Sequence, residues 1–264
     1  MSPMSLETEI VSDILRHKWG GGAGPREGVL IVHSAFRSLS RQGVKAEAFC
    51  AALLDALFGT TLLMPTMTWR SVTPAAPVFD EMATPSHTGI LTEVFRTRFA
   101  SHRSLHPTHS VAGAGPLAAL LLGTHHQGTT PCAGNSPYGL IRDYPTLILM
   151  LGTGMETCTA IHHAEEVMAS ELYVEPPEWA EAYRLIDRTG KVHPVLTRRH
   201  RRLPRDFPAL VPILEQSGRL LRGRSLGLNW LLFSAGDLYQ LVFSRLSQCR
   251  AATLRKDLAD AACP

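Results

Sequence analysis

A short run of apolar residues, T-L-I-L-M-L at 146–151, constrains the fold of this chain most strongly. A strand this apolar has to be buried on both faces of a sheet, and the glycines of L-G-T-G directly after it end the run. Two similar runs occupy 29–32 and 61–64, and a segment with the apolar spacing of a helix, 46–58, separates them. Strands that alternate with helices predict an α/β fold, here a layered sandwich around a central mixed sheet.

The C-terminal third of the chain has a different pattern. Residues 183–187 and 192–197 flank an Arg-Thr-Gly turn and predict a hairpin, and helices are predicted at 208–217 and 235–249. Residues 69–87, rich in Pro and Thr, predict a long ordered loop. We therefore expect a C-terminal hairpin-plus-helix region beside the α/β core.

Composition favours an ordinary globular protein in the cytoplasm. Hydrophobic residues make up 45% of the chain and charged residues 19%, and no apolar run approaches the roughly 20 residues that cross a bilayer. The first 19 residues are amphipathic and partly acidic, unlike a secretory or transit peptide. The five cysteines are scattered and never form C-x-x-C, so we expect reduced thiols and no thiolate zinc site.

The basic segment R-R-H-R-R at 198–202, followed by Arg205, supplies much of the net charge of +3. A nucleic-acid-binding surface needs a recognisable motif beside such a segment, and none accompanies it, so we expect no nucleic-acid partner. The segment is expected to form a solvated face, or a pocket wall facing an anionic cofactor. The glycine-rich run 20–25 precedes a strand and lacks the Lys-Ser/Thr of a phosphate loop, so it predicts a linker.

The stretch T-A-I-H-H-A-E-E-V at 159–167 carries the residues best suited to chemistry. His162 precedes Glu165 by three residues and Glu166 by four, so each pair shares one face of the predicted helix. Adjacent histidines point about 100° apart and do not form the H-E-x-x-H zinc arrangement, so no metal is expected. A histidine held by a carboxylate is the usual proton acceptor near neutral pH. The stretch predicts an acid–base site; the alternative, strongest for His163, is a histidine that only satisfies buried hydrogen bonds.

Six segments in a fixed order resemble one enzyme family. They are V-H-S-A-F-R-S-L at 32–39, L-M-P-T-M-T-W at 63–69, F-D and T-P-S-H-T-G within 79–89, R-S-L-H-P-T-H-S at 103–110, G-N-S-P at 134–137 and L-G-T-G-M-E-T-C-T-A-I-H-H-A-E at 151–165. This series resembles the aminoglycoside 3-N-acetyltransferase family. The resemblance implies one domain over 1–264, with a core at about 29–170 and a divergent acceptor-side region at about 171–248.

The resemblance implies acetyl-CoA as co-substrate, an amino group of an aminoglycoside-type antibiotic as acceptor, and direct acetyl transfer that gives resistance. His162 matches the histidine of the family's T-A-L-H-Y-A-E motif, the general base that takes a proton from the attacking amine. The CoA side is implied for His33, Ser34, Arg37, Ser38, Ser104, His106, Thr108 and Ser110. The acceptor side is implied for Thr66, Trp69, Asp80, His163 and Glu166. We expect a monomer or homodimer, with no metal and no membrane partner.

One departure from the family changes the expected acceptor. Family members commonly carry an acidic E-E-F-D-T-type segment after the hairpin, which supplies the glutamate that orients the histidine and carboxylates that hold a polycationic drug. Here 198–207 reads R-R-H-R-R-L-P-R-D-F, so Glu165, Glu166 or Asp206 has to replace that glutamate. Desolvated ammonium groups need carboxylate partners, so a basic region favours a less cationic acceptor, or an amine that also bears an acidic group.

Three interpretations of function follow from this departure. A less cationic antibiotic is typical of a divergent branch such as the kasugamycin 2′-N-acetyltransferases. An acidic amine indicates a biosynthetic acetyltransferase acting on a phosphonate or another secondary-metabolite precursor. The third interpretation is a CoA-binding protein without turnover, and the sequence leaves all three open.

Overall fold

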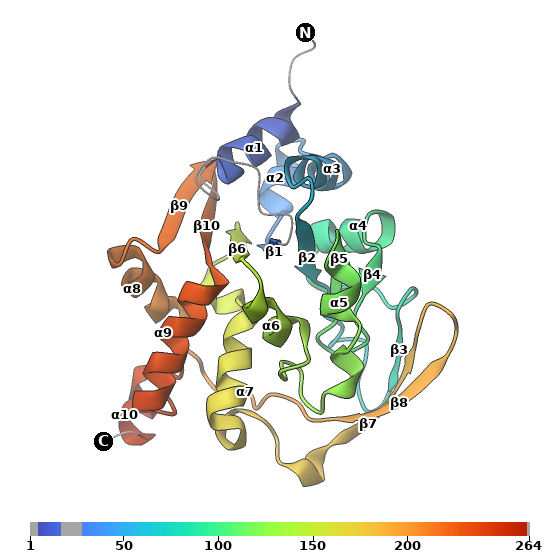
Figure 1. Ribbon diagram of the computed structural model, residues 1–264, viewed down its shortest axis with the longest axis vertical. Helices are drawn as coiled ribbons and strands as arrows, with labels where there is room; N and C mark the ends of the chain where they lie inside the picture. Colours follow the sequence, from blue (N-terminus) through green and yellow to red (C-terminus); the bar gives the residue numbers. More distant parts are fainter. Residues whose placement is uncertain (1–4, 17–27, 263–264) are drawn as a thin grey trace.

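The computed structural model describes residues 5–16 and 28–262, and its centre is a seven-stranded mixed sheet (Figure 1). The strand order is β4-β5-β2-β1-β6-β10-β9. The middle of the sheet is parallel. There β1 (Val29–Ser34) lies between β2 (Thr61–Pro65) and β6 (Thr146–Leu151) and pairs in parallel with both. The outer strands are antiparallel to their neighbours: β4 (His102–Arg103), β5 (Val111–Ala114), β9 (Leu220–Ser225) and β10 (Leu228–Ser234).

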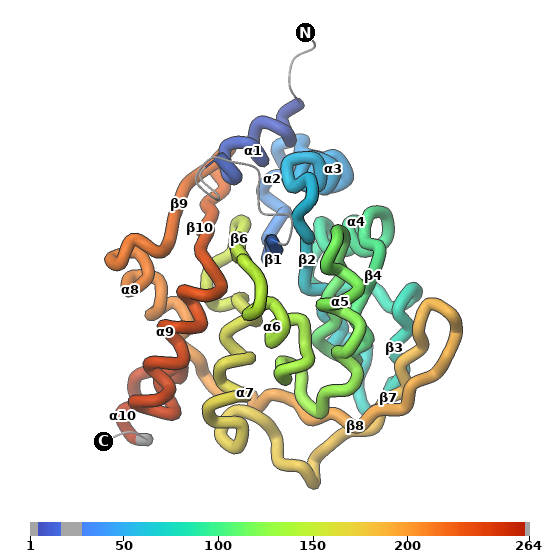
Figure 2. Tube along the Cα trace, viewed as in Figure 1, coloured from blue at the N-terminus to red at the C-terminus, as the bar shows by residue number. Residues whose placement is uncertain are grey.

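Helices cover both faces of this sheet, as the trace in Figure 2 shows, because strand side chains alternate between two separate cores. Val29 and Ile31 of β1 belong to one core, whereas Leu30 and Val32 belong to the other. The first core includes residues of α5 (Ala118–Leu122), α7 (Ala160–Tyr173) and α9 (Ala235–Gln248). The second includes residues of α1 (Leu6–Leu15), α3 (Ala46–Ala56) and α4 (Ile90–Arg98). The predicted layered α/β sandwich with a central mixed sheet is confirmed.

The remaining helices are short and connect these layers. They are α2 (Arg37–Arg41), α6 (Pro137–Leu140), α8 (Val211–Gln216), α10 (Lys256–Ala262) and the 3-10 segments His125–Gln127, Ile141–Asp143, Met155–Thr157, Pro177–Trp179 and Phe207–Leu210. The strands predicted at 29–32, 61–64 and 146–151 are confirmed, and so are the helices predicted at 46–58 and 235–249. The linker predicted at 20–25 lies outside the described residues.

A second sheet, of order β3-β7-β8, contains the predicted C-terminal hairpin. β7 (Glu181–Ile186) and β8 (Val192–Thr197) pair antiparallel, as expected, and β3 (Val78–Asp80) adds to β7 in parallel. The prediction of an uninterrupted loop over 69–87 is therefore wrong at β3. Phe79 of β3 is fully buried in a cluster with Tyr183 and Leu185 of β7. Long-range burial outweighs the Pro- and Thr-rich local sequence there.

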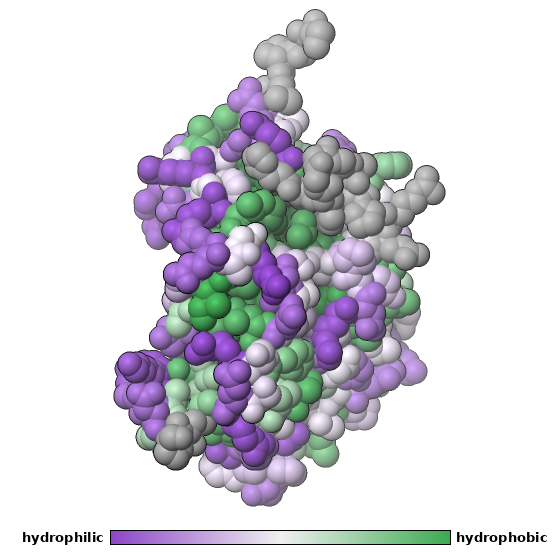
Figure 3. Space-filling view, turned by 60° about the vertical axis from the view of Figure 1, so that its left-hand side comes forward, coloured by the Kyte–Doolittle hydropathy of each residue, from purple (hydrophilic) through white to green (hydrophobic). Residues whose placement is uncertain are grey.

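The hairpin of β9 and β10 was not predicted from the sequence. Its turn residues, Leu226 and Gly227, both have positive φ, 46° and 73°, which suits the right-handed twist of a two-residue hairpin. Leucine rarely adopts this backbone, so the turn lacks its usual sequence signal. β9 is an edge strand on which Arg222 and Arg224 are exposed, and such charges oppose pairing with another chain. Figure 3 shows hydrophilic side chains spread over this side of the molecule, with apolar patches between them.

Two further expectations concern membranes and cysteines. Within the part of the chain that the structure describes, no helix has the length and apolar character needed to cross a membrane. Cys50, Cys132 and Cys158 are free and buried, as expected. Cys249 is disulfide-bonded, so the expectation of reduced thiols is wrong for that residue.

Gly152, directly after β6, tests how closely the chain packs beside the carboxyl ends of the strands. Its φ is +70°, and an added Cβ would lie 2.6 Å from Leu228 Cδ1 and 2.9 Å from the Ala35 carbonyl oxygen. Gly190 has a similar φ of +84° but no atom within 4 Å. We expect Gly190→Ala to lower the free energy of unfolding by about 1–2 kcal/mol and Gly152→Ala to lower it by a further ~1–3 kcal/mol, measured by urea unfolding. Equal losses in the two variants would contradict this packing.

Candidate active site

The carboxyl ends of the three parallel strands meet at one edge of the central sheet, where open α/β folds bind ligands. A cavity of about 800 Å³ opens at this edge. β1 contributes His33 and Ser34 to its lining, and β2 contributes Pro65. The segment between β6 and α7 contributes Thr159, and the first turn of α7 contributes His162. The sheet topology thus assembles the cavity from segments far apart in the chain.

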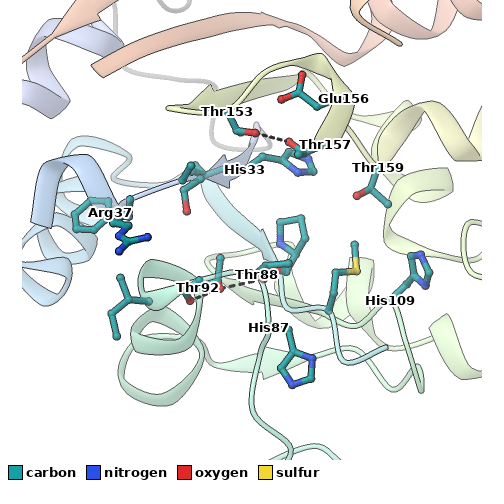
Figure 4. A pocket seen from close by; sticks show the side chains of 18 of the residues that line it. His33, Arg37, His87, Thr88, Thr92, His109, Thr153, Glu156, Thr157 and Thr159 are labelled. Atoms are coloured by element: carbon teal, nitrogen blue, oxygen red, sulfur yellow. Dashed lines mark hydrogen bonds between the residues drawn. The ribbon is translucent and has the colours of Figure 1, made fainter. Parts of the chain in front are cut away.

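The cavity lies between two polar walls (Figure 4). One wall includes Thr153 and Thr157, whose hydroxyls are hydrogen-bonded at 3.0 Å. The other includes Thr88 and Thr92, whose hydroxyls are also hydrogen-bonded at 3.0 Å. Arg37 lies at one end of the cavity, and the opposite end leads to α7.

His162 both lines the cavity and contacts a carboxylate. Its Nδ1 donates to Oε2 of Glu165 at 2.7 Å, one turn along α7. This bond fixes the proton on Nδ1 and leaves the lone pair of Nε2 available. Burial, and then the neighbouring His200, lowers the pKa of His162, although Glu165 opposes the change. The ring is therefore neutral near pH 7 and can accept a proton.

Glu165 is a fully buried carboxylate whose donors come from three parts of the chain. Besides His162, Nε of Arg205 donates to it at 3.0 Å and the hydroxyl of Thr253 at 2.6 Å. Burial acts to raise the pKa of Glu165, but the charges and hydrogen bonds of these partners outweigh burial, and the pKa is lowered. Of the carboxylates expected to orient His162, Glu165 is thus the one in contact with it. Asp206 instead begins the 3-10 segment Phe207–Leu210, where its backbone N–H donates to the Thr253 carbonyl.

A second histidine–carboxylate pair lies against the first. Nε2 of His200 donates to Oε1 of Glu166 at 2.6 Å, and the two side chains are 9% and 4% exposed. The ring centroids of His200 and His162 are 4.4 Å apart. His109, which lines the cavity, packs edge-on against His200 with 5.3 Å between centroids. Three neighbouring imidazoles and two carboxylates therefore lie together at the α7 end of the cavity, with His162 and His109 in its lining and the other three behind it.

Two buried polar atoms at the end of β1 have no hydrogen-bond partner among the described residues, His33 Nε2 and Ser34 Oγ. Both residues line the cavity. Burial lowers the pKa of His33 to about 4, so its ring is neutral near pH 7. Buried polar groups are costly unless they are paired, and a ligand in the cavity can supply the missing bonds.

Four of the residues expected on the CoA side form a buried network behind the cavity lining: Ser104, His106, Thr108 and Ser110. The Ser104 hydroxyl donates to Nδ1 of His125 at 2.8 Å. Nδ1 of His106 accepts the backbone N–H of Thr108 at 3.1 Å. The Ser110 hydroxyl donates to the carbonyl of Thr66, an expected acceptor-side residue, at 2.7 Å. These bonds hold the segment before β5 against β2, beneath the cavity rather than in its lining.

The other expected residues lie in different places. Trp69 lines the cavity and is 46% exposed. Asp80 closes the turn after β3, where its Oδ1 accepts two backbone N–H groups at 2.8 Å. Ser38 is exposed on α2. His163 is buried and its Nδ1 donates to the Cys132 carbonyl at 2.7 Å, which is the alternative interpretation given for this residue.

Three arginines of the basic segment are paired with carboxylates, of which Glu165 is fully buried and Glu181 and Glu175 are partly exposed. Arg199, Arg201 and Arg205 form ion pairs with Glu181, Glu175 and Glu165, respectively. No described residue of 198–205 lines the cavity. The expectation of a pocket wall is therefore wrong at this cavity. Arg201 and Arg202 are open to solvent, as expected of a solvated face, whereas Arg205 is paired with the buried Glu165.

Cys132, Glu166 and His200 present possible metal-ligand atoms within 4.8 Å of one another. The oxygens of Glu166 already accept the Thr130 hydroxyl, the Cys132 backbone N–H and His200. Burial raises the pKa of the Cys132 thiol well above its ordinary value, which disfavours the thiolate that zinc requires. The group is best described as a hydrogen-bonded cluster, and the absence of a metal stays a prediction.

Arg205, His200 and Thr253 were not among the expected site residues. In the sequence, Arg205 and His200 belong to a basic segment with no indication of a role at the site. The residues around Thr253 give no such indication either. Each contacts α7 from a distant part of the chain, so only the tertiary structure reveals its partner.

Comparison with known proteins identifies the family. A sequence profile described as Aminoglycoside 3-N-acetyltransferase matches residues 31–247. The chain belongs to this family. Aminoglycoside N(3)-acetyltransferase IV of Salmonella sp is 32% identical over 150 residues, which is 56% of this chain and 56% of the relative. Aminoglycoside N(3)-acetyltransferase IX of Micromonospora chalcea is 26% identical over 155 residues, 52% of this chain and 55% of the relative. The matches thus span about half the length of these curated relatives.

Solved structures of similar proteins share the fold over nearly the whole chain. The apoenzyme of aminoglycoside acetyltransferase AAC(3)-IVa has a TM-score of 0.73 at 23% identity, covering 97% of this chain and 96% of its own. AAC-IIIb, described as a binary structure with CoASH, has a TM-score of 0.75 at 20% identity, covering 92% and 96%. The resemblance to this family in the sequence is confirmed.

The buried histidines predict a loss of stability in acid. Burial lowers the pKa of His33 and of His125 from 6.5 to about 4, so below about pH 6.5 the unfolded chain binds protons that the folded protein does not. The free energy of unfolding therefore decreases as the pH is lowered, and these two groups together lower it by about 4 kcal/mol between pH 6.5 and 4.5. Urea unfolding across this range measures the fall, and in His125→Gln the contribution of these groups drops to about 2 kcal/mol. A free energy of unfolding that stays constant to pH 4.5 would contradict the assignment.

Proposed function

We propose that this chain is an acetyl-CoA-dependent N-acetyltransferase that acetylates an amino group of an aminoglycoside-type antibiotic and so gives resistance. The observation that carries the proposal is the 2.7 Å bond from His162 to Glu165 at the cavity, which leaves Nε2 of a cavity-lining imidazole unprotonated. Family membership over 31–247 supports the same chemistry. So do the similar structures described with apramycin and with CoASH.

In this proposal one proton moves twice, through His162. An ammonium cannot attack a thioester, so the acceptor reacts as the free amine, after its ammonium has released a proton to solvent. As the nitrogen lone pair forms a bond to the acetyl carbon, Nε2 of His162 takes one of the two N–H protons of the amine. The carbon–sulfur bond then breaks, the thiolate of CoA takes that proton from His162, and the neutral amide and CoA thiol are the products. Glu165 fixes the tautomer of the ring and stabilises the imidazolium between the two transfers. The acetyl group passes directly, without an acyl-enzyme.

The cavity suits acetyl-CoA in charge and in hydrogen-bonding capacity. Arg37 is the arginine in its lining, and a guanidinium at one end suits the phosphates of CoA. His33, whose Nε2 is unpartnered, lies between Arg37 and the α7 end in Figure 4, and Ser34 Oγ is also unpartnered. We assign these two groups to the pantetheine arm, whose amides can satisfy them.

Replacing His162 tests the base. We expect His162→Gln to lower kcat for CoA release by about 10²–10⁴-fold, because the amine then loses its proton acceptor. The matched control is His102→Gln in β4, outside the cavity lining, which should leave kcat within about twofold. An unchanged kcat in folded His162→Gln, with the same amine, would remove His162 from this role.

The charges in the cavity favour an acceptor with few ammonium groups. Among the described residues that line it, Glu156 is the acidic one, and it is an exposed residue. Glu165 and Glu166 already accept internal donors. A polycation would therefore leave several ammonium groups without a carboxylate. This favours an aminoglycoside with few free amines, as in the kasugamycin-type branch, and keeps an acidic biosynthetic amine as the second candidate.

A series of acceptors tests this preference. We expect kcat/KM for acceptors with one or two ammonium groups to exceed that for acceptors with four or five by at least about tenfold, because each unpaired ammonium costs about 1–3 kcal/mol. Measuring kcat/KM of Glu156→Gln with the same acceptors checks whether Glu156 is the carboxylate that holds a second ammonium. Antibiotic susceptibility of a host expressing the gene separates resistance from biosynthesis. Faster turnover of the most cationic acceptors would contradict the charge argument.

A further inference from the structure

The proposed reaction gives no role to the second histidine–carboxylate pair, His200 and Glu166. This pair is as short as the first, 2.6 Å against 2.7 Å, and similarly enclosed. Its imidazole packs against that of His162, with centroids 4.4 Å apart and an interplanar angle of 33°. Two imidazolium rings at this separation repel each other, so one proton is stable on the two rings and a second is disfavoured.

The partners of the two carboxylates differ in charge. Glu165 accepts Nε of Arg205, so a permanent cation already neutralises it. Glu166 accepts the Thr130 hydroxyl and the Cys132 backbone N–H, which are uncharged, together with His200. Two carboxylates and one arginine leave one negative charge in this buried region. Placing a single proton on the histidine pair makes the region neutral, and the carboxylate without a permanent cation attracts that proton most strongly.

We propose that His200 is a positioning residue that holds this proton as an imidazolium paired with Glu166, and thereby keeps the adjacent His162 neutral and ready to act. The inference rests on the proposed function for His162. Burial and then His200 lower the pKa of His162, which agrees with this arrangement.

The other charged and titratable groups that face the pair do not alter the arrangement. Arg205 acts on His162 through Glu165 and disfavours a second positive charge there. His109 faces His200 from the segment before β5, and burial, His200 and His162 all lower its pKa, so it is neutral. The Cys132 thiol lies beside Glu166 and His200, and burial raises its pKa, so it carries no charge. Burial lowers the pKa of His106 and of His125, so both are neutral. The remaining ring in contact with His162 is Phe207, which does not titrate.

A protonated His200 also assists the second half of the reaction. When His162 takes a proton from the amine, it becomes an imidazolium beside another imidazolium. That repulsion makes His162 a stronger acid, so it gives the proton to the departing thiolate of CoA more readily. His200 thus acts on both transfers without touching either substrate.

The first test uses the wild-type protein and needs no acetyl transfer. The imidazole Cε1–H signals of His162 and His200 are assigned by their loss in His162→Gln and His200→Gln, and are followed by NMR as the pH is lowered. We expect the signal of His200 to report protonation at a higher pH than that of His162. If His162 protonates first, or both protonate at the same pH, the proposal fails. Because this titration does not depend on turnover, it stays decisive even if no amine is acetylated and the proposed function fails.

The second test is the pH profile of kcat/KM in His200→Gln, which can still donate an amide hydrogen to Glu166 but carries no charge. Without the neighbouring cation, His162 binds its proton more tightly, so the acid limb should move to higher pH by about one unit. The matched control is His193→Gln, which breaks a similar pair, His193 with Asp187, outside the cavity lining and should leave the limb in place. A purely structural role for His200 predicts lower activity at every pH with an unmoved limb, and that result would overturn the proposal.

Discussion

The buried carboxylate of Glu165 is the interaction on which the candidate site depends. It has no exposure to solvent, so its charge has to be balanced inside the protein. It joins three segments: α7 through His162, the segment after β8 through Arg205, and the end of the chain after α9 through Thr253. Because the same carboxylate stabilises the packing of these segments and orients the imidazole, the geometry of the proposed base is set by the fold itself.

Charge pairing also explains the basic segment 198–205, which stands where we expected the acidic segment common in the family. Glu181, Glu175 and Glu165 form ion pairs with three of its five arginines, while Arg202 stays exposed. The carboxylate that contacts His162 comes from α7 itself, three residues away, and the distant segment supplies a guanidinium in its place. Glu165 is thus held between an imidazole of its own helix and a guanidinium of the distant segment, and the basic character of that segment leaves few carboxylates for a cationic acceptor.

Much of this arrangement was predictable where the signal is local. The apolar strands, the alternation with helices and the hairpin at β7 and β8 follow from short periodic patterns, and the contact of His162 with Glu165 follows from helical spacing. What could not be predicted depends on long-range contacts. β3 forms because Phe79 is buried beneath the hairpin, and the β9–β10 turn uses Leu226 at positive φ, which has no common sequence signature. Ser104 and Ser110, which the resemblance placed on the CoA side, instead belong to a buried hydrogen-bond network behind the cavity lining.

The central claim is that Nε2 of His162 removes the proton from the acceptor amine beside the thioester. The most direct measurement is a crystal structure of the ternary complex with CoA and an amine acceptor. The account predicts the acceptor nitrogen within about 3 Å of Nε2 of His162, with Nδ1 still bonded to Glu165 and the CoA sulfur close to the same nitrogen. An acceptor amine held by a different residue, on the side of the thioester away from His162, would contradict it.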